Sequence, residues 1–116
     1  EFIVTSTAAA ALDHVLNYPN PFTTHTEFQF EHNLPNQPMQ VQVQVFTVSG
    51  KLVKTIQEEV IADGYRVTGI EWDGMDDFGN PIGRGVYVYK VTIGLLSDTN
   101  QVTTSTSEFQ KLVILK

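Results

Sequence analysis

The sequence contains no cysteine, few positive charges and no long hydrophobic run. Without cysteine there is no disulfide framework, no zinc site built on thiolates and no thiol nucleophile. No apolar stretch approaches the ~20 residues that a helix needs to cross a bilayer. The formal net charge is −6 and the cations form no stripe along the chain, which argues against a nucleic acid partner. The seven cations are Lys51, Lys54, Arg66, Arg84, Lys90, Lys111 and Lys116.

Length and composition fit a single folded domain. With 116 residues, of which 41% are hydrophobic and 17% charged, the chain is long enough to bury a core. It begins with Glu rather than Met, which indicates a piece of a longer protein. Residues 1–11 are polar or Ala-rich, so we expect them to be a linker or a cloning remnant, and residues 12–116 to form the domain.

Alternating hydrophobic and polar residues predict strands throughout the chain and no helix. Val41, Val43 and Val45 alternate with glutamines, which is the period of a half-buried strand. At Phe46 the apolar phase changes, which predicts a bulge or the end of the strand. Seven strands are expected, at residues 12–16, 25–32, 39–48, 51–57, 68–73, 86–93 and in the closing SEFQKLVILK. The stretches 73–85 and 97–107 are expected to be loops.

Seven strands joined by turn residues need two layers, because a single sheet of this length would leave a large apolar face in water. The sequence therefore predicts an all-β, seven-stranded antiparallel immunoglobulin-like β-sandwich. Its core must hold by packing alone, with Trp72 at the centre. We expect the core to include Phe28, Phe30, Val43, Val45, Trp72 and Tyr87, with Tyr89, Val91 and Ile93 on the same face as Tyr87.

The stretch NYPNPF, residues 17–22, predicts a stiff extended corner. Pro19 and Pro21 lack a backbone N–H and cannot both lie inside a sheet, and each favours an extended conformation in the residue before it. We expect this corner to carry the chain from the first strand to the second, between the two sheets, with Tyr18 and Phe22 as apolar anchors.

Three patterns suggest chemistry but are better explained by structure. Asp73, Asp76 and Asp77, near Asn80, are oxygen ligands of the kind Ca²⁺ prefers, but their spacing is not that of an EF-hand, so they are a weak metal candidate beside ordinary turn chemistry. The glycines of residues 79–85 precede no helix and predict no phosphate site. The three histidines and the serines show no spacing typical of a metal site or a triad. No cofactor is expected.

The last strand is the most informative candidate site. Its alternation puts Phe109, Lys111, Val113 and Leu115 on one face and Leu112 and Ile114 on the other. If the first face packs into the sandwich, the pair Leu112 and Ile114 is left outward on an edge strand, where it can dock a partner through strand addition or an apolar patch. The alternative is a strand buried on both faces, and the sequence leaves both open. The expected docking residues are Phe109, Lys111, Leu112, Val113, Ile114, Leu115 and Lys116.

Several stretches, taken in order, resemble a known family. NYPNPF, then FTVSGKLVKTI, then WDGMDDFGNPIGRGVYVYKV resemble the immunoglobulin-like domains shared by flagellar hook-capping proteins and type IX secretion C-terminal domains. The closing FQKLVILK, with lysines near both ends, favours the type IX side. Over residues 12–116 the chain is most similar to the C-terminal domains of type IX sortases, which are gingipain-like cysteine proteases of Bacteroidetes.

This resemblance implies a non-catalytic sorting domain recognised by the type IX outer-membrane machinery. The implied partners are an outer-membrane β-barrel protein of that system and the parent protease domain, with no nucleic acid and no small-molecule substrate. The implied location is the cell surface or outer membrane, reached through the periplasm. The catalytic Cys and His of the sortases belong to the protease domain, so the resemblance places no catalytic residue in this chain. Two alternatives stay open: a structural assembly domain like that of the hook-capping proteins, and a carbohydrate-binding module using Tyr65, Tyr87, Tyr89 and Trp72.

Overall fold

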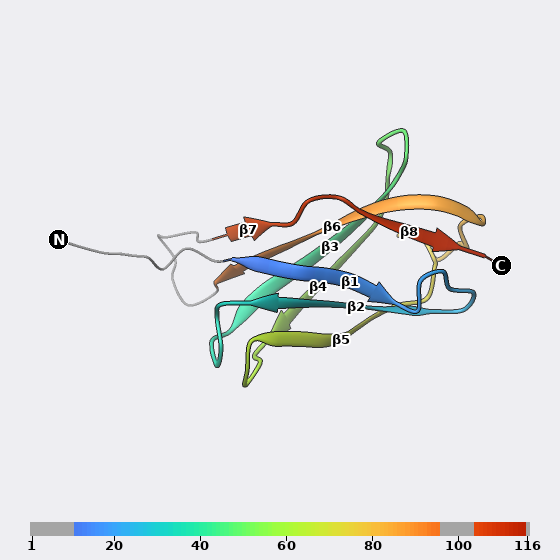
Figure 1. Cartoon of the computed structure of the whole chain (residues 1–116). Coiled ribbons are helices and arrows are strands. Elements are labelled where there is room, and N and C mark those ends of the chain that lie inside the picture. The colour runs from blue at the N-terminus through green and yellow to red at the C-terminus, as the bar shows by residue number, and fades with distance from the viewer. Residues whose placement is uncertain (1–10, 96–103, 116) are drawn as a thin grey trace.

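The computed structural model describes residues 11–95 and 104–115, and the expected linker, apart from Ala11, lies outside this range. The described chain is all-β, with eight strands in two antiparallel sheets that face each other as an immunoglobulin-like sandwich (Figure 1). The strands are β1 (Leu12–Tyr18), β2 (Thr26–His32), β3 (Met39–Thr47), β4 (Leu52–Val60), β5 (Arg66–Trp72), β6 (Gly85–Leu95), β7 (Thr104–Thr106) and β8 (Gln110–Ile114). Within the described residues there is no helix of the length and hydrophobicity that crossing a membrane requires.

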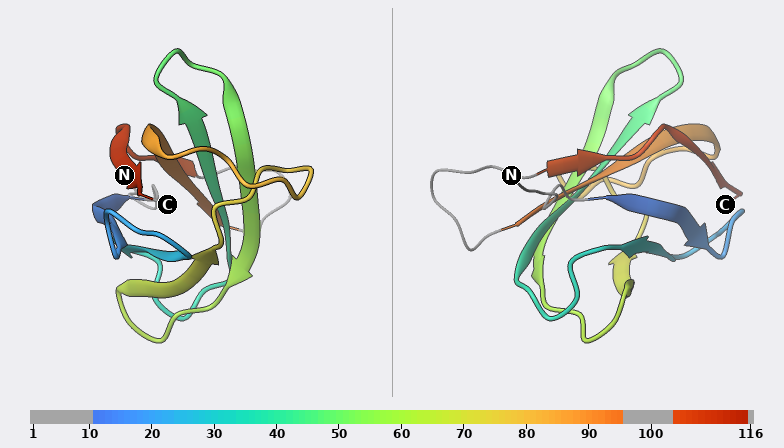
Figure 2. Two further views of the ribbon diagram at one scale, coloured as in Figure 1. Left: turned by 90° about the vertical axis from the view of Figure 1, so that its right-hand side faces the viewer. Right: turned by 60° about the vertical axis from the view of Figure 1, so that its left-hand side comes forward.

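The two sheets differ in size, and their strands β1 and β8 lie next to each other. The three-stranded sheet has the order β1-β2-β5, and the five-stranded sheet has the order β4-β3-β6, with β7 and β8 both paired to the remaining edge of β6. The views in Figure 2 show β8 lying beside β1 along one side of the sandwich. The strand β7 was not expected, because it lies in a stretch of Ser and Thr that shows no hydrophobic alternation.

Alternation along β2 and β3 produces the core. Val41, Val43 and Val45 are buried while the intervening glutamines are half-exposed, as predicted. The predicted bulge is also present, since the pairing of β3 with β4 shifts between Val45 and Phe46. Phe46 remains in β3, paired with Leu52 and Val88, and its side chain lies on the outer face of the five-stranded sheet.

Aromatic rings fill the centre of the sandwich. Trp72 is 3% exposed, stacks on Phe28 with ring centroids 6.4 Å apart, and donates its indole N–H to the carbonyl oxygen of Met75 at 2.8 Å. Phe28 in turn meets Tyr89 edge-on at 4.9 Å. Five of the six expected core residues are buried, whereas Tyr87 is only partly buried and its hydroxyl donates to the carbonyl oxygen of Gly83 at 2.7 Å.

The NYPNPF corner does not pass between the sheets, which corrects the expectation from the sequence. It joins β1 to β2, which are neighbours in the three-stranded sheet. Phe22 is an anchor, 2% exposed and 5.8 Å from the Trp72 ring, but Tyr18 is 70% exposed and anchors nothing. The backbone of Phe22 instead forms a parallel bridge to Ile114 of β8, so the corner ties the two sheets together at their edges.

Candidate docking surface on the terminal strand

The inner face of β8 is the opposite of the one expected. Leu112 is 0% and Ile114 1% exposed, so neither faces outward. The register with β6 explains this, because Tyr87 lies directly opposite Leu112 and opposite residues in an antiparallel pair point to the same side. Since Tyr87 packs against the core, Leu112 must do the same.

The outer face of β8 carries the odd-numbered residues of this stretch. Phe109 and Leu115, which flank the strand, are 59% and 55% exposed, Lys111 is exposed and Val113 is half-buried. Lys116 lies outside the described residues. The structure therefore leaves four of the seven expected docking residues accessible, and it assigns Leu112 and Ile114 to the core.

The free edge of β8 is already occupied by the proline corner. The side-chain amide of Asn20 donates to the carbonyl oxygen of Lys111 and accepts from the N–H of Val113, both at 3.0 Å. The backbone of Phe22 continues the pairing, donating to the carbonyl oxygen of Val113 at 3.0 Å and accepting from the N–H of Leu115 at 2.9 Å. Backbone groups that would template an added strand are thus satisfied within the chain, and only the outer face of β8 remains for a partner.

Two side chains from β3 and β6 meet the ring of Phe109, the residue just before β8, on this outer face. The rings of Phe46 and Phe109 lie 5.7 Å apart in an edge-on contact. The Lys90 ammonium sits over both, 5.7 Å from the centroid of Phe46 and 5.6 Å from that of Phe109. The positive edge of one ring and the cation both prefer the electron-rich face of a ring, so the cluster holds Lys90 in place.

Apolar side chains extend this cluster across the five-stranded sheet. By register, Val88 lies between Phe46 and Lys111, Val86 lies opposite Val113, and Leu52 lies opposite Phe46. Leu52 and Val86 are 44% and 47% exposed. We call this surface the β3–β6–β8 face, and its members are Phe46, Leu52, Val86, Val88, Lys90, Phe109, Lys111, Val113 and Leu115. Two signals of it are present in the sequence: the docking residues expected on the last strand, and the change of phase at Phe46.

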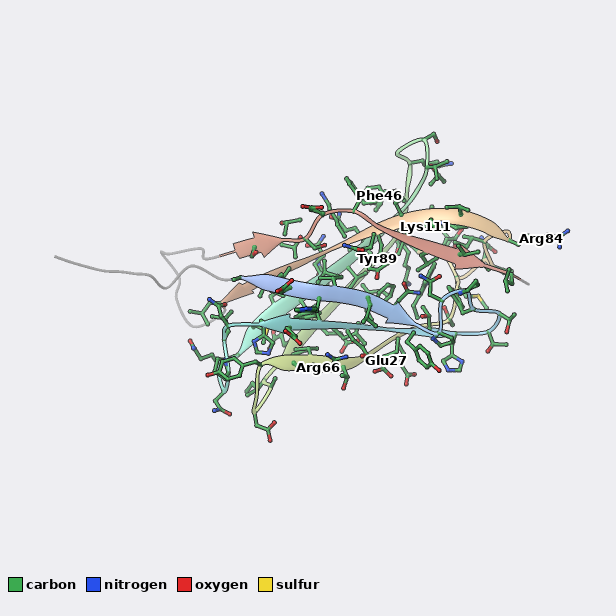
Figure 3. All side chains as sticks on the ribbon, in the orientation of Figure 1. Glu27, Phe46, Arg66, Arg84, Tyr89 and Lys111 are labelled. Atoms are coloured by element: carbon green, nitrogen blue, oxygen red, sulfur yellow. The ribbon has the colours of Figure 1, made fainter. Side chains whose placement is uncertain are left out.

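The outer face of the three-stranded sheet has the opposite character (Figure 3). The Glu27 carboxylate accepts from the Gly69 N–H at 2.8 Å, and Arg66 donates to the Gln29 side chain at 2.7 Å. Arg66 also pairs with Glu31 at 3.8 Å. In Figure 3 Glu27 and Arg66 lie on one layer and Phe46 and Lys111 on the other. The two outer faces are therefore distinct: one is polar and internally paired, and the other carries an apolar patch with two lysines beside the glutamines of β3.

The carboxylates of the 73–85 loop do not converge. Each accepts a backbone N–H instead: Asp73 from Met75, Asp76 from Phe78 and Asn80, and Asp77 from Thr55. Asp77 also pairs with Lys54 at 3.8 Å. Their geometry is that of turn-stabilising side chains, which was the simpler explanation from the sequence.

One group of possible ligands was missed from the sequence, because its members come from two strands. Nδ1 of His14 lies 3.3 Å from Asp13 and 3.0 Å from Glu31 on the neighbouring strand. In the described part of the chain this is the one cluster of three such residues. All three side chains are largely exposed, and Glu31 is shared with Arg66, so the group is accounted for as a surface ion-pair network.

The aromatic residues of the carbohydrate alternative do not form a platform. Trp72 and Tyr89 are buried, and burial raises the pKa of the Tyr89 hydroxyl. Tyr65 is exposed but begins the approach to β5, away from Tyr87 on β6. A sugar ring cannot stack on rings that lie between the two sheets.

Comparisons with known proteins agree with the geometry. The PorU structure from Porphyromonas gingivalis, described as a dimeric latent form, has a TM-score of 0.79 at 25% identity over 98% of this chain, which spans 10% of the PorU chain. The C-terminal domain of wzt shares the fold, with a TM-score of 0.58 at 12% identity, over 95% of this chain and 75% of the wzt chain. FlgD from Xanthomonas campestris gives a TM-score of 0.49 at 22% identity, over 90% of this chain and 68% of that chain.

The family comes from the sequence comparison. A search of curated proteins gives no significant match. The sequence model of the FlgD Ig-like domain matches residues 17–94, which is more than half of the chain and runs from the proline corner to the end of β6. The chain therefore belongs to the FlgD Ig-like domain family and is a non-catalytic immunoglobulin-like domain.

Proposed function

We propose that this domain is a docking and sorting module read by the type IX outer-membrane secretion machinery, and that it is the retained tail of a cell-surface sortase. The proposed partners are an outer-membrane β-barrel protein of that system and the parent protease domain. The proposed location is the cell surface, reached through the periplasm. Support comes from the similarity to PorU over almost the whole chain and from the resemblance of the closing FQKLVILK to type IX domains.

The observation that carries this proposal is the exposed apolar surface around β8. A monomeric soluble domain seldom leaves side chains such as Phe109, Leu115, Val86 and Leu52 in one continuous patch unless a partner covers them. Because the edge of β8 is closed by Asn20, the contact is made by the face of the strand rather than by an added strand.

The experiment is a display assay on a reporter that carries this chain at its C-terminus, expressed in a type IX-competent bacterium. Deleting residues 109–116 is a poor test, because it removes Leu112 and Ile114 from the core and unfolds the sandwich. Replacing Phe109 and Leu115 together by Ser removes only outward side chains. We expect this pair to abolish surface display while the melting temperature stays within a few degrees of the parent.

A matched control is Tyr65→Ser with Ile61→Ser, since these side chains are 64% and 69% exposed and lie off the β3–β6–β8 face. The control variant is expected to be displayed like the parent. Normal display of the folded Phe109 and Leu115 variant would overturn the proposal.

The second candidate is a structural assembly domain, which the match to the FlgD Ig-like family favours. An assembly domain works through contacts with copies of its own protein, so it predicts that the isolated chain self-associates and that display does not depend on type IX components. Sedimentation of the chain at increasing concentration, together with the display assay in a type IX-deficient strain, separates the two functions.

A further inference from the structure

We propose that the β3–β6–β8 face takes an acidic protein surface, one that presents carboxylates among apolar side chains. This inference rests on the proposed function and specifies the chemistry of the partner at that site. It is argued from the two lysines of the face, Lys90 and Lys111, and from what their burial in a complex requires.

The two lysines are positioned but have no acidic partner. Lys90 is held between Phe46 and Phe109, and Lys111 lies opposite Val88 on the same face. Among residues 11–95 and 104–115, neither ammonium lies within ion-pair distance of a carboxylate, and Glu108, the acid next to Phe109 in sequence, pairs with neither. Of the four other described cations, Lys54 pairs with Asp77 and Arg66 with Glu31, whereas Lys51 and Arg84 have no ion pair; neither of these two lies between aromatic rings as Lys90 does.

Covering this face with a purely apolar partner would be unfavourable. The apolar residues Val86, Val88 and Val113 lie directly beside the lysines, so a partner that buries the patch also takes at least one ammonium group out of water. A buried charge without a counter-ion costs several kcal/mol, and an opposite charge with hydrogen bonds offsets that cost. The partner must therefore bring carboxylates to the lysines while its apolar side chains cover the valines.

The charge of the whole chain also affects from which side an acidic partner docks. The net charge is −6, so an acidic partner is repelled by much of the domain and is attracted where cations such as Lys90 and Lys111 have no acid beside them. The outer face of the three-stranded sheet carries Glu27 and Glu31, which disfavours docking from that side. The lysines thus select the orientation as well as the partner.

An anionic membrane surface fits the same face less well. A basic residue near an anionic surface contributes about 1 kcal/mol, and segments that bind such membranes use about 4–8 of them. The β3–β6–β8 face supplies two lysines. Lys90, fixed between two rings, is also suited to a directional contact with one carboxylate rather than to a diffuse layer of charge.

The test measures binding of the 116-residue chain to outer-membrane vesicles from a type IX-competent Bacteroidetes strain. Lys90→Gln with Lys111→Gln removes both charges but keeps much of the side-chain length. We expect it to weaken binding by about 100-fold, about tenfold for each lost contact to a carboxylate. Lys90→Arg with Lys111→Arg keeps both charges and is expected to bind within about threefold of the parent. Raising the salt concentration should weaken the parent more than the Gln pair.

The control Lys54→Gln with Arg66→Gln removes two charges away from the face, since Lys54 pairs with Asp77 and Arg66 lies on β5 of the other sheet, and it is expected to bind like the parent. Parental affinity of the Lys90 and Lys111 Gln pair would overturn the inference. Equal binding of the parent to protein-free vesicles made from the extracted lipids would also overturn it, in favour of a membrane surface. If the parent binds vesicles from a type IX-deficient strain equally well, the proposed function itself fails, whatever the lysines do.

Discussion

Replacing Leu112 by Ala tests the reversed orientation of the terminal strand. Leu112 is fully buried between the sheets, whereas Leu115, three residues later, is 55% exposed. The sequence alone left open whether Leu112 faces outward or is buried, so the two leucines give a direct comparison within one strand and its flank. Both substitutions remove the same atoms, and only their surroundings differ.

The expected magnitude follows from burial. A buried Leu→Ala substitution loses the transfer free energy of the side chain and leaves a cavity, which costs about 3 kcal/mol within a usual range of roughly 2–5. The unfolding entropy of a chain of 116 residues is about 0.24 kcal/mol/K near the transition, from about 2.1 cal/mol/K for each residue. Leu112→Ala should therefore lower the melting temperature by about 12 °C. Leu115→Ala should change the stability by less than about 0.5 kcal/mol, or about 2 °C.

The assay is thermal unfolding followed by circular dichroism, with Trp72 fluorescence over the same temperature range as an independent probe of the core. Coincidence of the two curves shows that a single transition is being measured. An unchanged melting temperature for Leu112→Ala, together with a large drop for Leu115→Ala, would refute the assignment of the inner face of β8.

Three further predictions test the corner, the buried histidine and the core. Asn20→Ala removes two hydrogen bonds to the backbone of Lys111 and Val113, so we expect a loss of about 1–3 kcal/mol in urea unfolding and faster amide exchange at Val113; unchanged exchange would contradict the sealed edge. Burial lowers the pKa of His32, whose Nε2 has no partner in the described chain. The unfolded chain therefore binds a proton at this histidine near pH 6.5, whereas the folded domain binds it only at lower pH. Stability should therefore be fully present above pH 6.5 and fall below it, by up to about 1.4 kcal/mol per pH unit, while His32→Gln lacks this fall; equal pH profiles would contradict the reasoning. Trp72→Ala should cost about 3–5 kcal/mol and melt the domain far below the parent, and a loss under 1 kcal/mol would contradict its central place in the core.

The fold could be predicted from the sequence because its central strands alternate strictly. In β3 every second residue from Met39 to Val45 is apolar, and in β2 Phe28 and Phe30 alternate with polar residues, so the inner face of each strand follows from the pattern alone. Pairing between distant strands does not appear in such a pattern. The bridge between Phe22 and Ile114 joins residues far apart in the sequence. From the sequence the corner was therefore expected to cross between the sheets, and its hydrogen bonds to the edge of β8 were not predicted. The contact between His14 and Glu31 was not predicted either, because it also joins residues of two different strands.

The candidate surface could be located but not oriented. The closing strand is apolar at both parities, so alternation could not decide between Leu112 with Ile114 and Val113 with Leu115. The decision comes from β6, where Tyr87 opposes Leu112 and fixes the register. The cluster of Phe46, Lys90 and Phe109 combines two strands and the residue before β8, and its parts are recognisable in the sequence only as separate residues.

Site-specific photo-crosslinking tests the central claim, that the outer face of the terminal strand is what the secretion machinery contacts. A photoreactive phenylalanine analogue at Phe109 would be compared with the same analogue at Tyr65 and Ile61, which are at least as exposed but lie off the β3–β6–β8 face. In a type IX-competent bacterium displaying the reporter, we expect an adduct with an outer-membrane protein from position 109 and none from positions 61 and 65. Adducts from positions 61 or 65 in the absence of one from 109 would contradict the account.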